Sequence, residues 1–487
     1  MQKSLQIYRA FLLLGFSLAS LSCTKESYQN QHYLPKQIVT KSQEMEMGDF
    51  FVSVEMASQL VLQESKSDPV SIEEYPSDSD PLVYVVNQQQ GWKIIPADSR
   101  FGLYLAICDS GSIDLRKDLN DGVRVWLQDY MEQIKDARSK DEIPENSRES
   151  VAFWERIRNR IEKRNDTGIG ITKSLQPDPD QIWAKVEVSY SNNVISNRNQ
   201  DHLLSTKWGQ GSPWNIRLNN AGYNFPMGCV AVACGQILYY FHHNGGIPYD
   251  MYHIIDISPV YHYSLYYNYF TFFASRSQYV NFSSYWDQMP LDRSGSNPSC
   301  YEYVSNLMLD IGDRVGMKYT ENGSFAPGDT LGPYYIDSLF VNSRAFYSDS
   351  CQDTVMTNLD NGNPVIINSL IQGEDNGHTW VIDGYKYLQT IESGEYMFVP
   401  CLQVDLLNDV IINFYDYSYL LSQYPGLYSG MTVNESTNLL SAMYRMNWGY
   451  DGDGDEALYS MTYPSWQGYN GSKSIIYNLE PKGLLIQ

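Results

Sequence analysis

The chain has 487 residues, of which 43% are hydrophobic and 19% are charged, so it is long enough for two or three globular domains and is not a disordered tail. With 34 basic against 57 acidic residues, its formal net charge is −23. Such an excess of negative charge repels phosphate backbones and excludes nucleic acid as an expected partner.

The first 22 residues have the pattern of an export signal. Two basic residues accompany the apolar stretch 10–22, which is too short to span a membrane. Small residues before Cys23 resemble a bacterial lipoprotein processing site, although Leu21 lies one position closer to the cysteine than usual. We therefore expect a signal peptide at 1–22 and an exported protein, either secreted or held at the outer membrane by a lipid on Cys23.

Two strands and two helices are predicted in the first half of the chain. Residues 82–86 and 92–96 are short β-branched runs joined by a turn, which is typical of a hairpin. Residues 118–139 and 149–164 place hydrophobic side chains at helical spacing. The stretch 165–199 is rich in Asp, Pro, Ser and Asn. Apart from a short strand at 183–188, its composition predicts a linker with a domain boundary inside it.

The second half reads as one buried helix followed by many strands. Residues 227–243 form the most apolar predicted helix, and a second helix is predicted at 301–315. The Tyr- and Phe-rich region 245–290 reads as loops. A short helix near 351–360 precedes candidate strands at 364–370, 379–385, 397–405, 444–448, 456–461 and 474–479. This order favours an α+β domain and not a doubly wound α/β fold.

A candidate nucleophile is found among the cysteines. Cys229 follows Gly228 at the start of the most apolar helix, where the helix dipole and free N–H groups lower a thiol pKa. Cys234 lies inside the same helix and reads as a small buried residue. From position alone, an inert packed cysteine at 229 is as good an interpretation as a nucleophile.

A candidate base is found among the seven histidines. His378 follows Gly377 and opens the apolar segment TWVIDGY, so it lies at a strand edge where glycine leaves room for a substrate. A solvated turn histidine is the competing interpretation. Of the others, His242 and His243 lie at a helix end, and His253 and His262 lie in the tyrosine-rich loop region.

Three further residues complete the predicted site. Asn447 could accept a hydrogen bond from the imidazole through its amide oxygen, and the adjacent Trp448 could shield that bond from water. Gln210, in KWGQGSPWN, could donate its side-chain amide to an oxyanion. Each of these residues is weak evidence alone, but the order of Gln210, Cys229, His378 and Asn447 along the chain is specific.

In this order the chain resembles the streptopain group of papain-fold cysteine peptidases. The matching stretches are LLSTKWGQGSPWN, GCVAVACGQILYYF, GHTWVIDGY and NWGYDGDGDEALY, within residues 201–487. Upstream, VYVVNQQQGWKIIPADSR and the helix ending in YMEQIKDARSK look like the inhibitory propeptide of that group. The resemblance implies a papain-like α+β domain made as a zymogen, with Cys229 as nucleophile and His378 as its partner. It also places Gln210 as the oxyanion donor and Asn447 and Trp448 in the NWG motif.

The resemblance divides the chain and leaves two departures. It implies a signal peptide at 1–22, a propeptide at 23–199 and a peptidase domain at 200–487, with an insertion over 392–440. The turn after NWG is more acidic than the family pattern, and its alternating aspartates imitate a calcium loop. Glu456 stands where that loop needs glycine, so we expect a solvated acidic turn and no metal or organic cofactor.

The expected activity is hydrolysis of protein or peptide substrates, with the propeptide as an intramolecular inhibitor. Two alternatives stay open on the sequence. One is a catalytically silent surface lipoprotein that binds glycan or peptide through its 40 tyrosines. The other is an acyltransferase that uses the same Cys–His pair.

Overall fold

The structure is a computed structural model, and it describes residues 48–65, 69–117, 119–165, 183–244, 253–263, 268–277, 283–295, 297–326, 336–370, 377–400, 433–465 and 473–482. Residues Met1–Ile38 form a separate unit from Val39–Gln487, and all described residues belong to the second unit. The predicted signal peptide and Cys23 lie outside the described residues. Within the described ranges, no helix has the length and apolar character needed to cross a bilayer.

The N-terminal part of this unit is an antiparallel meander with helices on both faces. Its strands are β1 (Ser71–Tyr75), β2 (Val83–Asn87), β3 (Trp92–Pro96) and β4 (Ala106–Cys108), each paired with the next. The predicted hairpin is confirmed as β2 and β3. Side chains alternate along β2, so Tyr84 and Val86 pack in one core and Val83 and Val85 in another.

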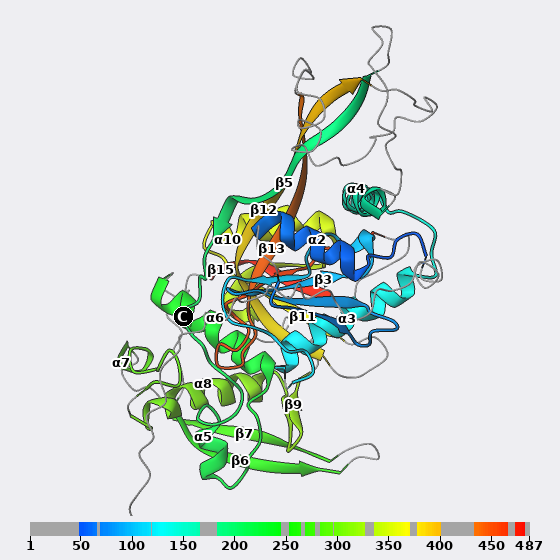
Figure 1. Ribbon diagram of the computed structural model, residues 1–487. Coiled ribbons are helices and arrows are strands. Elements are labelled where there is room, and N and C mark those ends of the chain that lie inside the picture. The colour runs from blue at the N-terminus through cyan, green and yellow to red at the C-terminus, as the bar shows by residue number, and fades with distance from the viewer. Residues whose placement is uncertain are drawn as a thin grey trace, which may run out of the picture. The chain divides into compact units, whose positions relative to one another are not determined.

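Three helices cover this meander. Helices α2 (Val54–Ser65) and α4 (Arg148–Asn165) pack with Tyr84 on one face, and α3 (Asp121–Ala137) packs on the other (Figure 1). Asn120 caps α3 by accepting a hydrogen bond from the Val123 N–H at 2.8 Å. The two predicted helices are confirmed as α3 and α4, whereas α2 has no counterpart among the predicted elements.

The C-terminal part contains the remaining helices and strands. The most apolar predicted helix is confirmed as α6 (Cys229–Asn244), and α8 (Cys300–Arg314) packs against it. The other elements are β5 (Trp183–Gln200), α5 (Ile216–Asn220), β6 (His253–His262), β7 (Tyr269–Ser277), α7 (Ser283–Trp286), β8 (Lys318–Thr320), β9 (Gly323–Phe325), α9 (Asp337–Leu339), β10 (Phe340–Phe346), α10 (Gln352–Asp360), β11 (Val365–Leu370), β12 (Gly377–Pro400), β13 (Val433–Asn447), β14 (Leu458–Ser460) and β15 (Lys473–Pro481).

One large sheet joins the two parts. Its strand order among the described residues is β1-β2-β3-β4-β14-β13-β12-β11-β15-β10, and β5 pairs with β12 outside this path. Strands β4 and β14 form the junction, where Leu458 pairs with Ile107 and Tyr459 with Ala106. All strand pairs of this sheet among the described residues are antiparallel, and helices pack on both of its faces, which confirms the predicted α+β class.

The predictions for three segments were wrong or incomplete. Most of the described part of the linker, 165–199, is the long strand β5, which is paired along β12. The region 245–290, predicted as loops, contains the hairpin β6–β7. The described ends of the insertion 392–440 extend β12 and β13 as an antiparallel pair. In each case pairing with a distant or neighbouring strand decides the conformation, which composition does not reveal.

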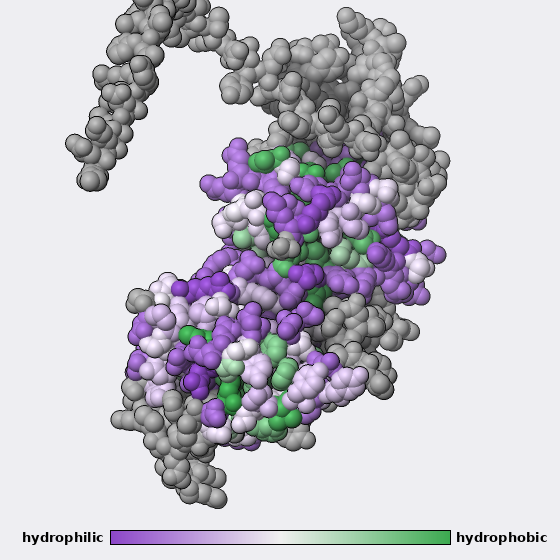
Figure 2. All heavy atoms as spheres, turned by 90° about the horizontal axis from the view of Figure 1, so that it is seen from below, coloured by the Kyte–Doolittle hydropathy of each residue, from purple (hydrophilic) through white to green (hydrophobic). Residues whose placement is uncertain are grey.

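Hydrophobic side chains concentrate in three buried cores, and the surface is mixed. One core surrounds α6 and α8, a second lies between α3 and the sheet, and a third lies under α2 and α4. On the face shown in Figure 2, hydrophilic residues predominate and hydrophobic ones gather in small patches. The α6 core and the α3 core lie on opposite faces of the sheet, since Val381 of β12 packs in the first core and Trp380 and Ile382 pack in the second. Both helices therefore meet β12, one from each face.

Candidate active site

The candidate nucleophile begins helix α6. Cys229 is the first residue of this helix, and its side chain is partly exposed. The preceding Gly228 has a φ of +88°, and a Cβ there would lie 2.8 Å from the Met317 side chain, so this entry into the helix requires glycine. The first N–H groups of a helix lack intrahelical partners and carry partial positive charge, which stabilises a thiolate.

The candidate base lies at the start of β12 and meets the cysteine. His378 is 4% exposed and lies opposite Ser369 of β11. Its Nε2–H donates to the backbone carbonyl of Trp448 at 2.8 Å, which leaves Nδ1 for the side-chain hydrogen bond with Cys229. The fold therefore brings together the two residues that the sequence predicted as a pair.

The electrostatics of this pair favour a charged thiolate and imidazolium. Burial alone raises the pKa of Cys229, but the charge and hydrogen bond of His378, with backbone hydrogen bonds at Thr379 and Val230, lower it on balance. Burial alone lowers the pKa of His378, but the charge and hydrogen bond of Cys229 and the Trp448 carbonyl raise it on balance. Opposite shifts of this kind are expected when each group stabilises the charged form of the other.

Asn447 lies beneath the site, but it does not contact the imidazole as predicted. Its Nδ2 donates to the carbonyl of Thr206 at 2.8 Å, and its Oδ1 accepts from Nε2 of Gln236 at 2.8 Å. The acceptor for His378 is the main-chain oxygen of Trp448 instead. The prediction assigned the correct motif but the wrong oxygen atom.

The turn after Asn447 explains this difference. Gly449 has a φ of +75°, and this reversal presents the carbonyl of Trp448 to the ring. The Trp448 N–H donates to Oδ1 of Asp455 at 3.0 Å and the Gly449 N–H donates to Oδ1 of Asn447 at 3.3 Å, so the peptides on both sides of Trp448 are held. The buried Trp448 indole packs against Trp380, with 4.9 Å between the ring centroids, and Trp380 stacks on the imidazole. The predicted bond between Asn447 and the imidazole, which Trp448 was expected to shield, is not the one that the structure shows.

Gln210 lies beside the nucleophile segment. Its carbonyl accepts a hydrogen bond from the Met227 N–H at 2.9 Å, two residues before Cys229. Its side chain hydrogen-bonds the Tyr450 hydroxyl, and that hydroxyl donates to Oδ2 of Asp121 at 2.7 Å. The predicted oxyanion donor is therefore near the thiol, with its amide engaged by a tyrosine that is itself bound to α3.

The N-terminus of α3 covers the imidazole. A Cβ at Gly122 would lie 2.5 Å from Cε3 of Trp448 and 3.0 Å from Cδ2 of His378, so the helix backbone packs directly on both rings. Asn120, the capping residue of α3, donates from Nδ2 to the carbonyl of Asp453 at 2.8 Å. The segment 120–122 therefore occupies space that a substrate would need above the base.

The rest of α3 is anchored to the C-terminal part by polar contacts. Nε1 of Trp126 donates to the carbonyl of Ser460 at 2.9 Å, and the Tyr130 hydroxyl donates to the carbonyl of Thr462 at 3.0 Å. Asp129 forms a buried ion pair with Lys473, whose side chain is 3% exposed. Burying an ion pair stabilises an interface only when both partners are present.

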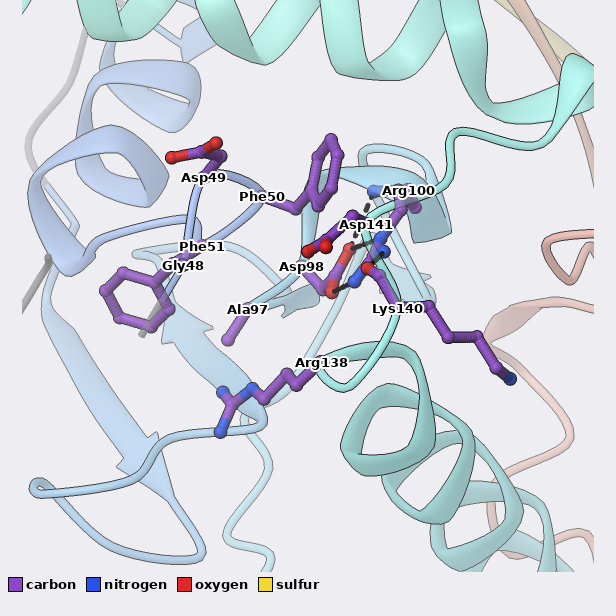
Figure 3. Close-up of a pocket in the computed structure, with 10 residues that line it drawn as sticks. All are labelled: Gly48, Asp49, Phe50, Phe51, Ala97, Asp98, Arg100, Arg138, Lys140 and Asp141. Carbon is purple, nitrogen blue, oxygen red and sulfur yellow. Dashed lines mark hydrogen bonds and ion pairs between the residues drawn. The ribbon is translucent and has the colours of Figure 1, made fainter. Parts of the chain in front are cut away.

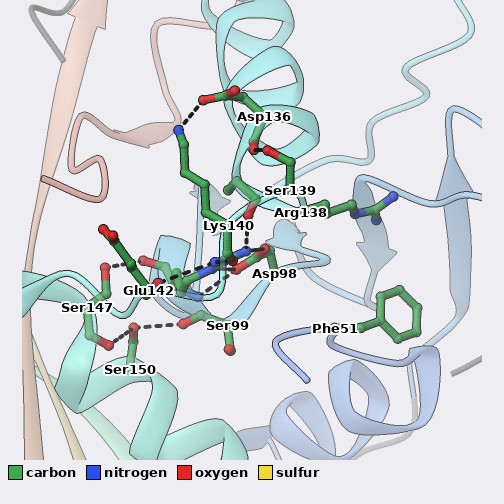
Figure 4. A network of polar contacts seen from close by, with 12 residues as sticks. Phe51, Asp98, Ser99, Asp136, Arg138, Ser139, Lys140, Glu142, Ser147 and Ser150 are labelled. Carbon is green, nitrogen blue, oxygen red and sulfur yellow. Dashed lines mark hydrogen bonds and ion pairs between the residues drawn. The ribbon is translucent and has the colours of Figure 1, made fainter. Parts of the chain in front are cut away.

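An arginine fixes the opposite end of α3. The Arg100 guanidinium forms a buried ion pair with Asp98 and donates to the carbonyls of Ala137 and Lys140 at 2.7 and 2.6 Å (Figure 3). Figure 4 shows the same network extending towards α4, where Ser150 donates to the carbonyl of Ser99 at 2.8 Å. The neighbouring pocket of about 110 Å³ contains none of the predicted site residues, and the network orients α3 from a distance.

Two buried polar groups near the site were missed by the sequence analysis. Gln236, inside α6, bonds to Asn447, and its only sequence signal is a polar residue within an apolar helix. Asp455 lies under Trp448, and burial, together with the charge of Asp383, raises its pKa to about 8. Asp383 is itself buried and accepts from Nδ1 of His202 at 2.9 Å.

The acidic turn is more ordered than the predicted solvated turn. Asp451 accepts hydrogen bonds from Nε1 of Trp214 at 2.5 Å and from Nε of Arg293 at 2.7 Å. Asp455 is 2% exposed, so only part of the turn is solvated. Among the described residues, no group of three or more His, Cys, Asp or Glu side chains is arranged to hold a metal ion.

Two family models match separate parts of the chain. Residues 208–399 match the Peptidase C10 family, and residues 36–134 match the Spi protease inhibitor family. Together these matches cover more than half of the chain. A comparison with curated proteins finds no match.

Among solved structures the chain is similar to two from Prevotella intermedia. A fragment of prointerpain A is 18% identical with a TM-score of 0.49, over 85% of this chain and 99% of that one. Active interpain A cysteine protease is 19% identical with a TM-score of 0.33, over 62% of this chain and 98% of that one.

The peptidase match spans the segment from Trp208 through the nucleophile helix α6 to β12, and the inhibitor match spans the meander and most of α3. The chain is a cysteine peptidase of the C10 (streptopain) family that carries an inhibitor-type prosegment before its peptidase part.

Proposed function

We propose that the chain is the zymogen of a cysteine endopeptidase in which Cys229 is the nucleophile and His378 is the general base and acid. The observation that carries this proposal is the side-chain hydrogen bond between a thiol at a helix N-terminus and a buried imidazole whose other nitrogen is fixed by a carbonyl. This arrangement supplies an activated nucleophile and an oriented base in one contact.

The reaction follows from these positions. The Cys229 thiolate attacks the carbonyl carbon of a peptide, forming the C–S bond, and the oxyanion is held by the Cys229 N–H and the Gln210 amide. The His378 imidazolium then gives its proton to the amide nitrogen, the C–N bond breaks, and the amine leaves. Water, deprotonated by His378, attacks the thioester, and the acid product and the free thiolate–imidazolium pair are released.

The prosegment suppresses this reaction by occupying the site. Gly122 packs on the imidazole, and the Gln210 amide is bonded to Tyr450, which is held by Asp121. Activation requires the N-terminus of α3 to leave, which uncovers His378 and frees Gln210. We place the prosegment at 23–199 and the peptidase domain at 200–487.

Export is the second part of the proposal. It rests on the apolar stretch 10–22 and on Cys23 at its end. A lipid on Cys23 would hold the precursor at the outer membrane, and ordinary secretion is the alternative outcome. Metabolic labelling with a fatty acid, with and without Cys23→Ser, distinguishes the two.

The test compares purified wild-type precursor with Cys229→Ala and His378→Ala. We expect only the wild type to release its prosegment and then to hydrolyse labelled casein, with both variants slower by roughly 10⁴-fold or more. Equal processing and casein hydrolysis by all three chains would overturn the assignment. An added amine that becomes joined to the acyl product in preference to water would instead indicate an acyltransferase.

A further inference from the structure

One buried glutamine lies on the same face of α6 as the nucleophile. Gln236 is 0% exposed and comes seven residues after Cys229, which is two helical turns. Its neighbours in the helix are apolar or small, so an amide at this depth must find its hydrogen bonds inside the protein.

Both ends of this amide are bonded to segments outside the helix. Nε2 donates to Oδ1 of Asn447 at 2.8 Å, and Oε1 accepts the backbone N–H of Trp208 at 3.3 Å. Asn447 completes the network by donating from Nδ2 to the carbonyl of Thr206. A fully satisfied buried network of this kind restricts the relative positions of the segments that it connects.

Each connected segment carries one part of the candidate site. Helix α6 carries Cys229, the turn after Asn447 carries the Trp448 carbonyl that accepts from His378, and the Trp208 segment leads to Gln210 two residues later. Gln236 touches none of the reacting groups, yet it is bonded to both other segments.

We propose that Gln236 is a positioning residue that holds the nucleophile helix, the turn presenting the Trp448 carbonyl and the segment bearing Gln210 in one catalytic register. This inference rests on the proposed function of Cys229 and His378. It assigns the amide an effect on turnover and on the titration of the pair, beyond its effect on stability.

The expected signature follows from the bond between His378 and Trp448. That bond is one of the causes that raise the pKa of His378, so a loosened turn lets the imidazolium lose its proton at lower pH. The weaker imidazolium in turn stabilises the thiolate less. The active pH range should therefore narrow from both sides, with the alkaline limb moving down and the acidic limb moving up.

The experiment uses the full chain, self-processed, with active sites counted by irreversible alkylation. Gln236→Leu keeps the volume and removes both hydrogen bonds. We expect kcat per counted site to fall by about 10- to 100-fold, with KM changed less than about threefold. The acidic limb of the pH–activity profile should move to higher pH and the alkaline limb to lower pH. Gln236→Met gives the same readout if the leucine variant yields too few counted sites.

Asn306→Leu is the matched control. Asn306 is 4% exposed and lies in α8, the helix packed against α6, and among the described residues its Oδ1 has no hydrogen-bond partner, unlike the amide oxygen of Gln236. This control should leave kcat per counted site and the pH of both limbs unchanged, whatever its effect on stability or yield. The inference would be overturned if the Gln236 variants kept the wild-type kcat and the wild-type pH–activity profile. It would also be overturned if Asn306→Leu narrowed the active pH range as much as the Gln236 variants do. A wild type that neither hydrolyses casein nor is alkylated at Cys229 would instead overturn the proposed function.

Discussion

At the scale of single residues, the imidazole is held by a main-chain atom. The carbonyl of Trp448 accepts from His378, the N–H of the same residue donates to Asp455, and the Gly449 N–H of the carbonyl's own peptide donates to Oδ1 of Asn447 at 3.3 Å. Side-chain substitution cannot remove this acceptor directly, but it can move the peptide that carries it. Substitution of Asp455 or Asn447, which lie beneath the turn, should therefore change the position of the acceptor for His378.

The raised pKa of Asp455 predicts that the free energy of unfolding depends on pH. Burial raises its pKa to about 8 from an ordinary value of 3.8, so between these values the folded chain holds a proton that the unfolded chain has lost. The free energy of unfolding that this carboxyl contributes therefore falls as pH rises, by up to about 1.4 kcal/mol per pH unit. Asp455→Asn keeps an acceptor for the Trp448 N–H and removes the titration.

The measurement is urea unfolding of the Cys229→Ala precursor with and without Asp455→Asn, at pH 5 and pH 8.5. We expect the asparagine variant to gain stability relative to its parent as pH rises. A difference between the two chains that stays constant with pH would contradict a protonated, buried Asp455.

The sequence predicted that Cys229 and His378 act together, and the structure places these two side chains in contact, but the groups around them were not predicted. Cys229 was identifiable from its position at a helix start, and His378 from its position at a strand edge, once their order along the chain was considered. The acceptor for the imidazole was not, because the choice between the Asn447 amide and the Trp448 carbonyl depends on the path of the turn at Gly449. Gln236 was missed because its partners come from distant segments.

At the scale of elements, helices were easier to predict than paired strands. Helices α3 and α6 follow from local hydrophobic spacing, which the sequence displays directly. Strands β6 and β7 and most of β5 were missed because their conformation depends on a partner strand, whereas a short strand at 183–188, the start of β5, was predicted. Helix α3 matters most for function, because its first turn covers His378.

The close packing of α3 at Gly122 leads us to expect a direct effect of this helix on self-processing of the precursor. A Cβ at this position would collide with Trp448 and crowd His378, and overpacking of this kind costs about 1–3 kcal/mol. Gly122→Ala should therefore speed self-processing of the precursor by roughly tenfold, although alanine by itself favours a helix. Lys135→Ala, on the exposed face of α3, should process at the wild-type rate. A rate of self-processing in Gly122→Ala that is equal to or lower than that of the wild type would contradict the packing of α3 on Trp448 and His378.

The buried ion pair between Asp129 and Lys473 is expected to hold much of α3 in place. Asp129→Asn leaves the buried Lys473 ammonium without a counter-charge and should reduce the free energy of unfolding of the Cys229→Ala precursor by about 3 kcal/mol or more. The exposed pair between Asp136, in the last turn of α3, and Lys140, just beyond that helix, offers the control, since Asp136→Asn should cost less than about 1 kcal/mol. Equal losses in the two variants would argue against a special role for the buried pair.

At the scale of the whole molecule, the prosegment and the peptidase part share one sheet. Strand β14 is paired with β13 on one side and with β4 of the prosegment on the other, and the Ser460 N–H donates to the carbonyl of Leu105 at 2.7 Å. Removal of the prosegment would convert β14 into a sheet edge. Release of α3 and opening of this edge are therefore expected to occur together.

Hydrogen exchange tests that coupling. The Ser460 amide should exchange at least about tenfold faster in the processed, alkylated enzyme than in the Cys229→Ala precursor, because it loses the Leu105 carbonyl as its acceptor. Amides of β11, which lies between β12 and β15, serve as the reference and should not change. Unchanged protection of the Ser460 amide would mean that β4 and β14 do not form the junction.

The account depends most on the thiolate–imidazolium pair of Cys229 and His378. The direct measurement is the rate of Cys229 alkylation by iodoacetamide as a function of pH, followed by mass spectrometry in the wild-type and His378→Ala chains. We predict that the wild-type thiol reacts as a thiolate well below its ordinary pKa of 9.0 and that His378→Ala moves this titration to higher pH. The same titration midpoint in both chains would contradict the account.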